Sequence, residues 1–245
     1  MTLAAGARIA RLGLGSGIVA DSEAGAEWRE CLVKGKFVET TRRFDLIETM
    51  RFDPLEGVLE LDRHLARMKD SADALGFPFD RHEARNELQA ATFRAGPSRL
   101  RLLLSRSGAF AIELRPLPAL PDPPVEVALR PLPVDSADFR LRHKTSDRAF
   151  YDEAREASGT FEVVFQDAEG FLTEGSFTNL FVARGGKLVT PPLSRGLLPG
   201  VLRARLLEEG KAAEGELRPD DLADGFFLGN AVRGLVPARL SSGSA

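Results

Sequence analysis

Five prolines between positions 116 and 124 constrain the fold of this chain more than any other feature. Each proline fixes its own φ angle and lacks an amide hydrogen, so such a run forms neither a helix nor a central strand. Proline-rich segments instead make stiff, extended connections. We therefore predict an α/β unit over residues 39–118, a proline-rich linker over 119–124, and a second unit over 125–245. Residues 1–38 form a separate, glycine-containing head.

The composition is typical of a globular protein, with 43% hydrophobic and 28% charged residues in a chain of 245. A formal net charge of -3 gives no electrostatic reason to expect a nucleic acid or a membrane as partner. No apolar run approaches the roughly 18 residues of a membrane span. The single cysteine, Cys31, excludes an intramolecular disulfide and suits a reducing compartment, so we expect a cytoplasmic protein without a structural metal.

The first unit should contain a strand, two helices and a hairpin. Residues 44–52 have the pattern of a strand. A helix over 61–75 is predicted because apolar side chains recur there at spacings of three and four, and Gly76 suits its C-terminal end. Residues 100–104 and 110–114 should pair as a hairpin around Ser107 and Gly108.

The second unit should contain short strands and one helix. Strands are expected at 161–166, 170–173 and 180–182, separated by glycine-containing turns. A helix is expected over 201–209, directly after Pro199 and Gly200, because proline and then glycine mark its entry. Residues 225–228 then lead into a final turn.

Four pieces of the second unit carry the residue types needed for one kind of chemistry. Lys144 supplies an amine, Glu174 a carboxylate at the end of a strand, and the segments at 200–202 and 230–231 supply backbone amides. A lone lysine or a lone glutamate in a turn is usually solvated. Together they match the needs of pyridoxal phosphate, which takes an amine for its aldehyde, a carboxylate for its ring nitrogen and amides for its phosphate.

The run Thr-Glu-Gly-Ser-Phe-Thr-Asn-Leu-Phe at 173–181 is the most specific of these motifs. With the other pieces it resembles the fold-type-IV pyridoxal phosphate enzymes, the class IV aminotransferases, over roughly residues 43–240. The resemblance implies a mixed α/β (α+β) structure with two domains, similar to D-amino-acid aminotransferase. It also implies pyridoxal phosphate as cofactor, bound between the domains, and a homodimer.

The resemblance also assigns roles to residues. Lys144 would bind the cofactor covalently and act as the catalytic base, and Glu174 would hold the proton of the pyridine nitrogen. The phosphate would be held by a set of one arginine and two turns: Arg67, Gly200, Val201, Leu202, Asn230 and Ala231. Leu202 can offer only its backbone amide, where the aminotransferase branch has a threonine.

For three further side chains we predict a substrate-binding or a structural role. Arg51 lies on the strand that would reach the active site, where it either binds a substrate carboxylate or is structural. We expect His64 to be a packed, hydrogen-bonded histidine without a catalytic role, and Asn179 to brace its loop through backbone hydrogen bonds.

The run at 44–51 and the pair Asn230-Ala231 resemble aminodeoxychorismate lyases more than the other branches of the family. Such enzymes convert 4-amino-4-deoxychorismate to 4-aminobenzoate and pyruvate, on the route to folate. Two alternatives stay open: a branched-chain or D-amino-acid aminotransferase, and a non-catalytic remnant of a broken fusion.

The fusion hypothesis comes from residues 1–36. Their glycines at 13, 15 and 17 and the acidic run that follows resemble the C-terminal tail of aminodeoxychorismate synthase component I. A synthase domain or a glutaminase subunit is therefore a possible partner. Because the rest of a synthase is not in this sequence, we expect the head to be dispensable for lyase chemistry.

Overall fold

The computed structural model describes residues 2–3, 10–11, 44–119 and 121–241. In the head, β1 (Thr2–Leu3) and β2 (Ala10–Arg11) pair in an antiparallel arrangement. The acidic helix expected before residue 37, the glycine-rich run and Cys31 lie outside the described residues.

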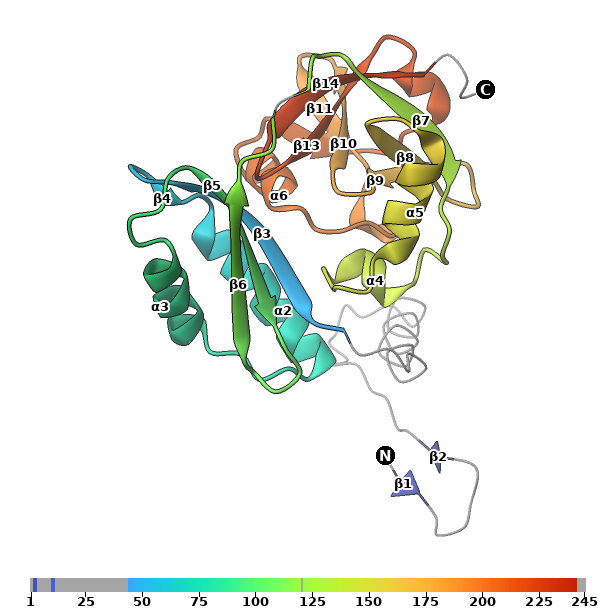
Figure 1. The fold of residues 1–245 in the computed structure, drawn as a ribbon. Coiled ribbons are helices and arrows are strands. Elements are labelled where there is room, and N and C mark those ends of the chain that lie inside the picture. The colour runs from blue at the N-terminus through green and yellow to red at the C-terminus, as the bar shows by residue number, and fades with distance from the viewer. Residues whose placement is uncertain (1, 4–9, 12–43, 120, 242–245) are drawn as a thin grey trace.

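The first unit is a four-stranded antiparallel sheet covered on one face by two helices (Figure 1). The strands run in the order β4 (Gly57–Val58), β3 (Leu46–Asp53), β5 (Ser98–Leu104) and β6 (Phe110–Pro116), and the helices are α2 (Leu61–Leu75) and α3 (Arg81–Ala91). The predicted helix and hairpin are confirmed. Gly76 ends α2 with a φ of 71°, a left-handed conformation that glycine adopts without strain.

Strand β5 has two different faces. Leu100, Leu102 and Leu104 are fully buried against the helices, whereas the alternating Arg99 and Arg101 point to the other face of the sheet. The arginine-bearing face of the first unit is the one turned toward the second unit, because both arginines line the cavity between the units.

The second unit is built on a closed six-stranded barrel. Its strands follow one another in the order β10 (Asn179–Arg184), β13 (Phe226–Asn230), β14 (Gly234–Leu240), β7 (Val125–Pro131), β8 (Glu162–Gln166) and β9 (Leu172–Gly175), and β9 pairs back onto β10. Strands β11 (Lys187–Thr190) and β12 (Ala212–Glu214) extend the sheet beyond β10. Apolar side chains such as Val127, Leu180 and Leu228 form the core.

Helices and short turns connect the barrel strands. These are α4 (Phe139–Arg142), α5 (Ala149–Ser158), α6 (Val201–Glu208) and the 3-10 turns η1 (Leu193–Arg195) and η2 (Pro219–Leu222). The predicted strands and the helix after Gly200 are confirmed, although β9 begins at Leu172 instead of at 170. Helices α4 and α5 and strands β7, β11, β12 and β14 were not predicted from the sequence.

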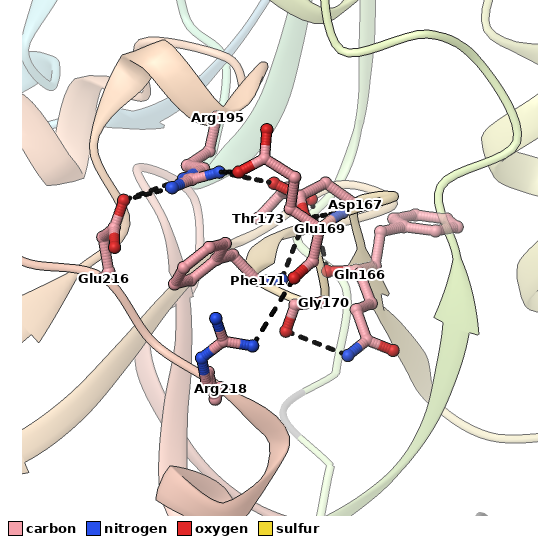
Figure 2. Close-up of polar contacts among 10 residues, drawn as sticks. Gln166, Asp167, Glu169, Gly170, Phe171, Thr173, Arg195, Glu216 and Arg218 are labelled. Carbon is pink, nitrogen blue, oxygen red and sulfur yellow. Dashed lines mark hydrogen bonds and ion pairs between the residues drawn. The ribbon is translucent and has the colours of Figure 1, made fainter.

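The turn between β8 and β9 is tied down by polar and aromatic contacts (Figure 2). Asp167 Oδ1 accepts hydrogen bonds from the amides of Glu169 and Phe171, both at 2.9 Å. The Phe171 ring lies between two guanidinium groups, with Arg195 Cζ 3.7 Å and Arg218 Cζ 3.9 Å from its centroid. These contacts fix the start of β9, the strand that carries the predicted cofactor-binding glutamate.

Within the described part of the chain, no helix combines the length and hydropathy that crossing a membrane requires. The same residues contain no group of histidine, cysteine, aspartate and glutamate side chains that could hold a metal ion.

Candidate active site

A cavity of about 590 Å³ lies between the two units and contains most of the predicted site residues. The first unit contributes side chains from β3, α2 and β5, and the second contributes α5, the β9–β10 loop, the start of α6 and the β13–β14 turn. The predicted residues that line it come from segments far apart in the sequence: Arg67, Lys144, Glu174, Gly200, Val201, Asn230 and Ala231.

Lys144 is held in place by the first unit. The Ile47 amide donates to the Lys144 carbonyl at 2.9 Å, and the next residue, Thr145, forms an isolated antiparallel bridge with Leu46. Burial lowers the pKa of the Lys144 amine to about 7, and the charges of Arg148 and Arg67 act in the same direction. An amine with such a pKa is a nucleophile near neutral pH.

Glu174 lies on β9, opposite Asn179 on β10. The buried hydroxyl of Tyr151 donates to Glu174 Oε1 at 2.6 Å. Burial raises the pKa of Glu174 to about 7, against the opposing effects of Arg148 and of the Tyr151 hydrogen bond. A carboxyl group that holds a proton at this pH can share it with a basic ring nitrogen. Tyr151, which the sequence analysis did not single out, therefore orients the glutamate.

The start of α6 supplies free backbone amides to the cavity. The first intrahelical bond there runs from the Ala204 amide to the Gly200 carbonyl, at 2.8 Å, so the three preceding amides have no intrahelical acceptor. A Cβ at position 200 would overlap Asn179 Oδ1. Asn179 donates from Nδ2 to the Leu198 carbonyl at 3.1 Å, so its side chain braces the segment before α6 and not its own loop as predicted. The segment fits a phosphate group because amides at a helix start favour anions.

The side chains of Leu202 and Asn230 contact other parts of the protein and support the local structure. The Leu202 side chain packs against Phe181 and Leu206, away from the cavity lining, so only its amide could serve the phosphate. Asn230 Oδ1 accepts from the amides of Val232 and Arg233 at 3.0 and 2.9 Å. These bonds shape the turn between β13 and β14, which exposes Ala231 to the cavity.

Arg67 is part of a buried cluster with Glu48 and His64. Its Nε and Nη2 donate to the Glu48 carboxylate at 2.8 and 2.6 Å, and its Nη1 donates to the Pro199 carbonyl at 3.0 Å. His64 Nδ1 lies 2.7 Å from Glu48 Oε2, so His64 is packed and hydrogen-bonded as expected. Arg67 thus connects the first unit to the start of α6.

A set of arginines that the sequence analysis did not identify lines the rest of the cavity. We call Arg99, Arg101, Arg155 and Arg233 the cationic wall. Burial and then the charge of Arg99 lower the pKa of Arg233, which indicates that these two arginines lie close to each other in the cavity lining. Arg51 shares a sheet face with Arg99, its partner across the strands, but lies outside the cavity lining.

The loop from Ser176 to Thr178 is anchored on a buried carboxylate. Glu162 accepts hydrogen bonds from the amides of Ser176 and Phe177 at 3.0 and 3.1 Å, and from Thr178 Oγ1 at 3.0 Å. A Cβ at Gly175 would lie 2.9 Å from Glu162 Oε2, so the loop needs glycine there. The anchor holds Phe177 and Thr178 in the cavity lining.

The chain is similar in sequence to a known protein family and to a named protein. The amino-transferase class IV family matches residues 45–240. A Schizosaccharomyces pombe protein, provisionally named an aminodeoxychorismate lyase, is 31% identical over 201 residues, which cover 77% of this chain and 86% of that protein.

Two solved structures have the same fold. A provisionally named amino-acid aminotransferase from Mesorhizobium loti is 42% identical, with a TM-score of 0.76 over 81% of this chain and all of that one (100%). A 4-amino-4-deoxychorismate lyase from Pseudomonas aeruginosa is 27% identical, with a TM-score of 0.69 over 80% of this chain and 82% of that one. The predicted mixed α/β fold is confirmed, and the structure shows that it consists of a small antiparallel sheet and a six-stranded barrel, which the sequence did not predict.

Proposed function

This chain belongs to the class IV aminotransferase family, whose cofactor is pyridoxal phosphate, and from that premise we propose that it is an aminodeoxychorismate lyase. It would convert 4-amino-4-deoxychorismate to 4-aminobenzoate and pyruvate. Membership of the family makes the chain a pyridoxal phosphate-dependent enzyme, and the proposal concerns which member it is.

The observation that carries the proposal is the cationic wall. Each of the two products has one carboxylate, so the substrate has two. Among the described residues, Arg99, Arg101 and Arg233 make no ion pair with a carboxylate, which leaves their charges available to a dianionic ligand. A branched-chain amino acid has one carboxylate and an apolar side chain, so it would leave part of this positive charge uncompensated. The second substrate of such an aminotransferase, 2-oxoglutarate, is also a dicarboxylate, so the two candidates are separated by a product assay.

Each residue of the site would have its own role toward the cofactor. Pyridoxal phosphate, when bound, supplies an electron sink for carbanion chemistry. Lys144 Nζ would hold the cofactor, and once released it would take the proton from the carbon that bears the substrate amine. Glu174 would hold the proton on the ring nitrogen. The amides of Gly200, Val201 and Leu202, the Asn230–Ala231 turn and Arg67 would hold the phosphate.

A product assay tests the proposal. The purified protein, loaded with pyridoxal phosphate, is given 4-amino-4-deoxychorismate, and 4-aminobenzoate is quantified by chromatography. Parallel reactions contain isoleucine with 2-oxoglutarate, or D-alanine with 2-oxoglutarate. Formation of 4-aminobenzoate with little transamination is the expected result. Transamination with no 4-aminobenzoate would favour the second candidate, an aminotransferase. The 42% identity to the Mesorhizobium loti protein supports that candidate.

Variants of the cationic wall link the assay to the structure. Arg233→Met should lower kcat/KM for aminodeoxychorismate by about 10- to 100-fold, because a hydrogen bond to a charged group contributes roughly 1.5–3 kcal/mol. Arg94→Met, at an exposed position outside the cavity lining, is the matched control and should change little. Light scattering on the same preparations would test the homodimer that the family resemblance predicts.

A further inference from the structure

We propose that His64 binds the phosphate of the cofactor through Nε2, held for that contact by the buried carboxylate of Glu48. The inference rests on the cofactor site of the proposed function, but it does not depend on which reaction follows. His64 comes from the first unit, on α2, and would join a phosphate site otherwise built mainly from turns of the second unit.

The state of Glu48 determines which ring nitrogen is available. Burial alone would raise the pKa of Glu48, but the Arg67 charge and the His64 hydrogen bond overcome it and hold that pKa at about 2. The carboxyl group is therefore ionised near neutral pH and can only accept hydrogen bonds. The contact of 2.7 Å to His64 Nδ1 then requires the proton to be on Nδ1.

The other ring nitrogen has no partner. His64 is only 1% exposed, it lines the cavity, and its Nε2 makes no hydrogen bond with any described residue. A buried polar atom without a partner is destabilising and therefore uncommon in folded proteins. A ligand that supplies the missing contact explains why the nitrogen is placed at the cavity.

The neighbours of His64 indicate that this ligand is the phosphate. Arg67 lies one turn further along α2, is bound to the same Glu48 oxygen, and reaches the Pro199 carbonyl at 3.0 Å. Pro199 directly precedes the amides at the start of α6. Glu48 thus aligns His64 and Arg67 beside the anion-binding helix end.

The charges agree with that placement. The positive charge of Arg67 is paired with the negative charge of Glu48 at 2.6 Å, so this pair contributes little net charge to a phosphate. Because Nδ1–H is donated to Glu48, a hydrogen bond between Nε2 and a phosphate oxygen needs one further proton between these two atoms. The phosphate monoester or the solvent supplies that proton.

Comparing pyridoxal phosphate with pyridoxal tests the proposal. The two ligands differ only in the phosphate, and their dissociation constants are measured by fluorescence titration with wild type and with His64→Gln. The variant should bind pyridoxal phosphate about 10-fold or more weakly and bind pyridoxal within about twofold of wild type. His82→Gln, at an exposed position on α3, is the matched control and should leave both affinities unchanged.

Equal weakening of binding for both ligands would show that His64 has only a packing role. Unchanged binding of both ligands would show that His64 does not contact the cofactor. Either result overturns the proposal.

If His64→Gln does not fold, a His82→Gln/His143→Gln variant keeps His64 as the last of the three histidines. Its Nε2 nitrogen resonance should shift on binding of pyridoxal phosphate but not of pyridoxal, and an unmoved resonance refutes the contact. Neither experiment uses the lyase substrate, so loss of the proposed reaction would leave this inference standing.

Discussion

The lowered pKa of Lys144 predicts how fast the cofactor attaches at each pH. At a pKa of about 7 roughly half of the Lys144 amines are uncharged at pH 7, against about one in 3,000 for a lysine with a pKa of 10.5. Only the uncharged amine attacks an aldehyde. The second-order rate constant for attachment should therefore rise about tenfold per pH unit below pH 7 and level off above it.

Rapid mixing with excess pyridoxal phosphate, followed by absorbance from pH 5 to pH 10, measures this profile. N-acetyl-lysine methylamide corrects for the ionisation of the cofactor, and Lys144→Ala shows the signal without the amine. Arg148→Gln should move the midpoint upward because the Arg148 charge lowers the pKa of Lys144. Arg155→Gln, on the helix α5 that follows Arg148, should leave the midpoint unchanged. A rate that still rises tenfold per unit above pH 9 would refute the argument from burial.

Four other outcomes are expected. Glu174→Gln should keep the cofactor bound but slow turnover by about 100-fold, because an amide cannot hold the ring proton; turnover within a few-fold of wild type would contradict that role. Gly200→Ala should weaken cofactor binding at least 10-fold in equilibrium titrations, because its Cβ would overlap Asn179 Oδ1. Glu162→Gln should lower the free energy of unfolding, measured in urea, by about 2 kcal/mol, because its amide cannot accept every bond that the carboxylate accepts. Deletion of residues 1–36 should leave cofactor affinity and turnover within about threefold, and a large loss of either would show that the head belongs to the enzyme domain.

Local sequence signals were sufficient for the elements that carry the cofactor motifs. The apolar spacing from Leu61 to Leu75 and the glycine after it predicted α2, and Arg67 follows from that helix. Pro199 and Gly200 predicted the start of α6 because proline and glycine act on the backbone of their own segment. The glycine of the motif around Glu174 acts locally in the same way, because a Cβ at Gly175 would meet Thr178 of the same turn. Asn179 instead bonds to Leu198, a contact between distant segments that local signals do not show.

The side chains that surround those motifs depend on tertiary contacts and could not be read in this way. Glu48 resembles any polar residue of an alternating strand until α2 brings His64 and Arg67 against it. Tyr151 belongs to α5, a helix that the sequence analysis missed, and reaches Glu174 across 23 positions of sequence.

One local sequence pattern indicated part of the cationic wall, namely the alternation of arginine and leucine from Arg99 to Leu102. Leucines buried on one face of a strand leave the arginines between them on the other face, and such a face needs either solvent or an anionic ligand. The sequence cannot distinguish these two cases, because the answer depends on what covers the second face of the sheet. Here the barrel covers it and brings Arg233 close to Arg99, so the arginine face of β5 becomes one side of a cavity. The charge of this cavity therefore depends on the contact between the two units, which no segment of the sequence shows by itself.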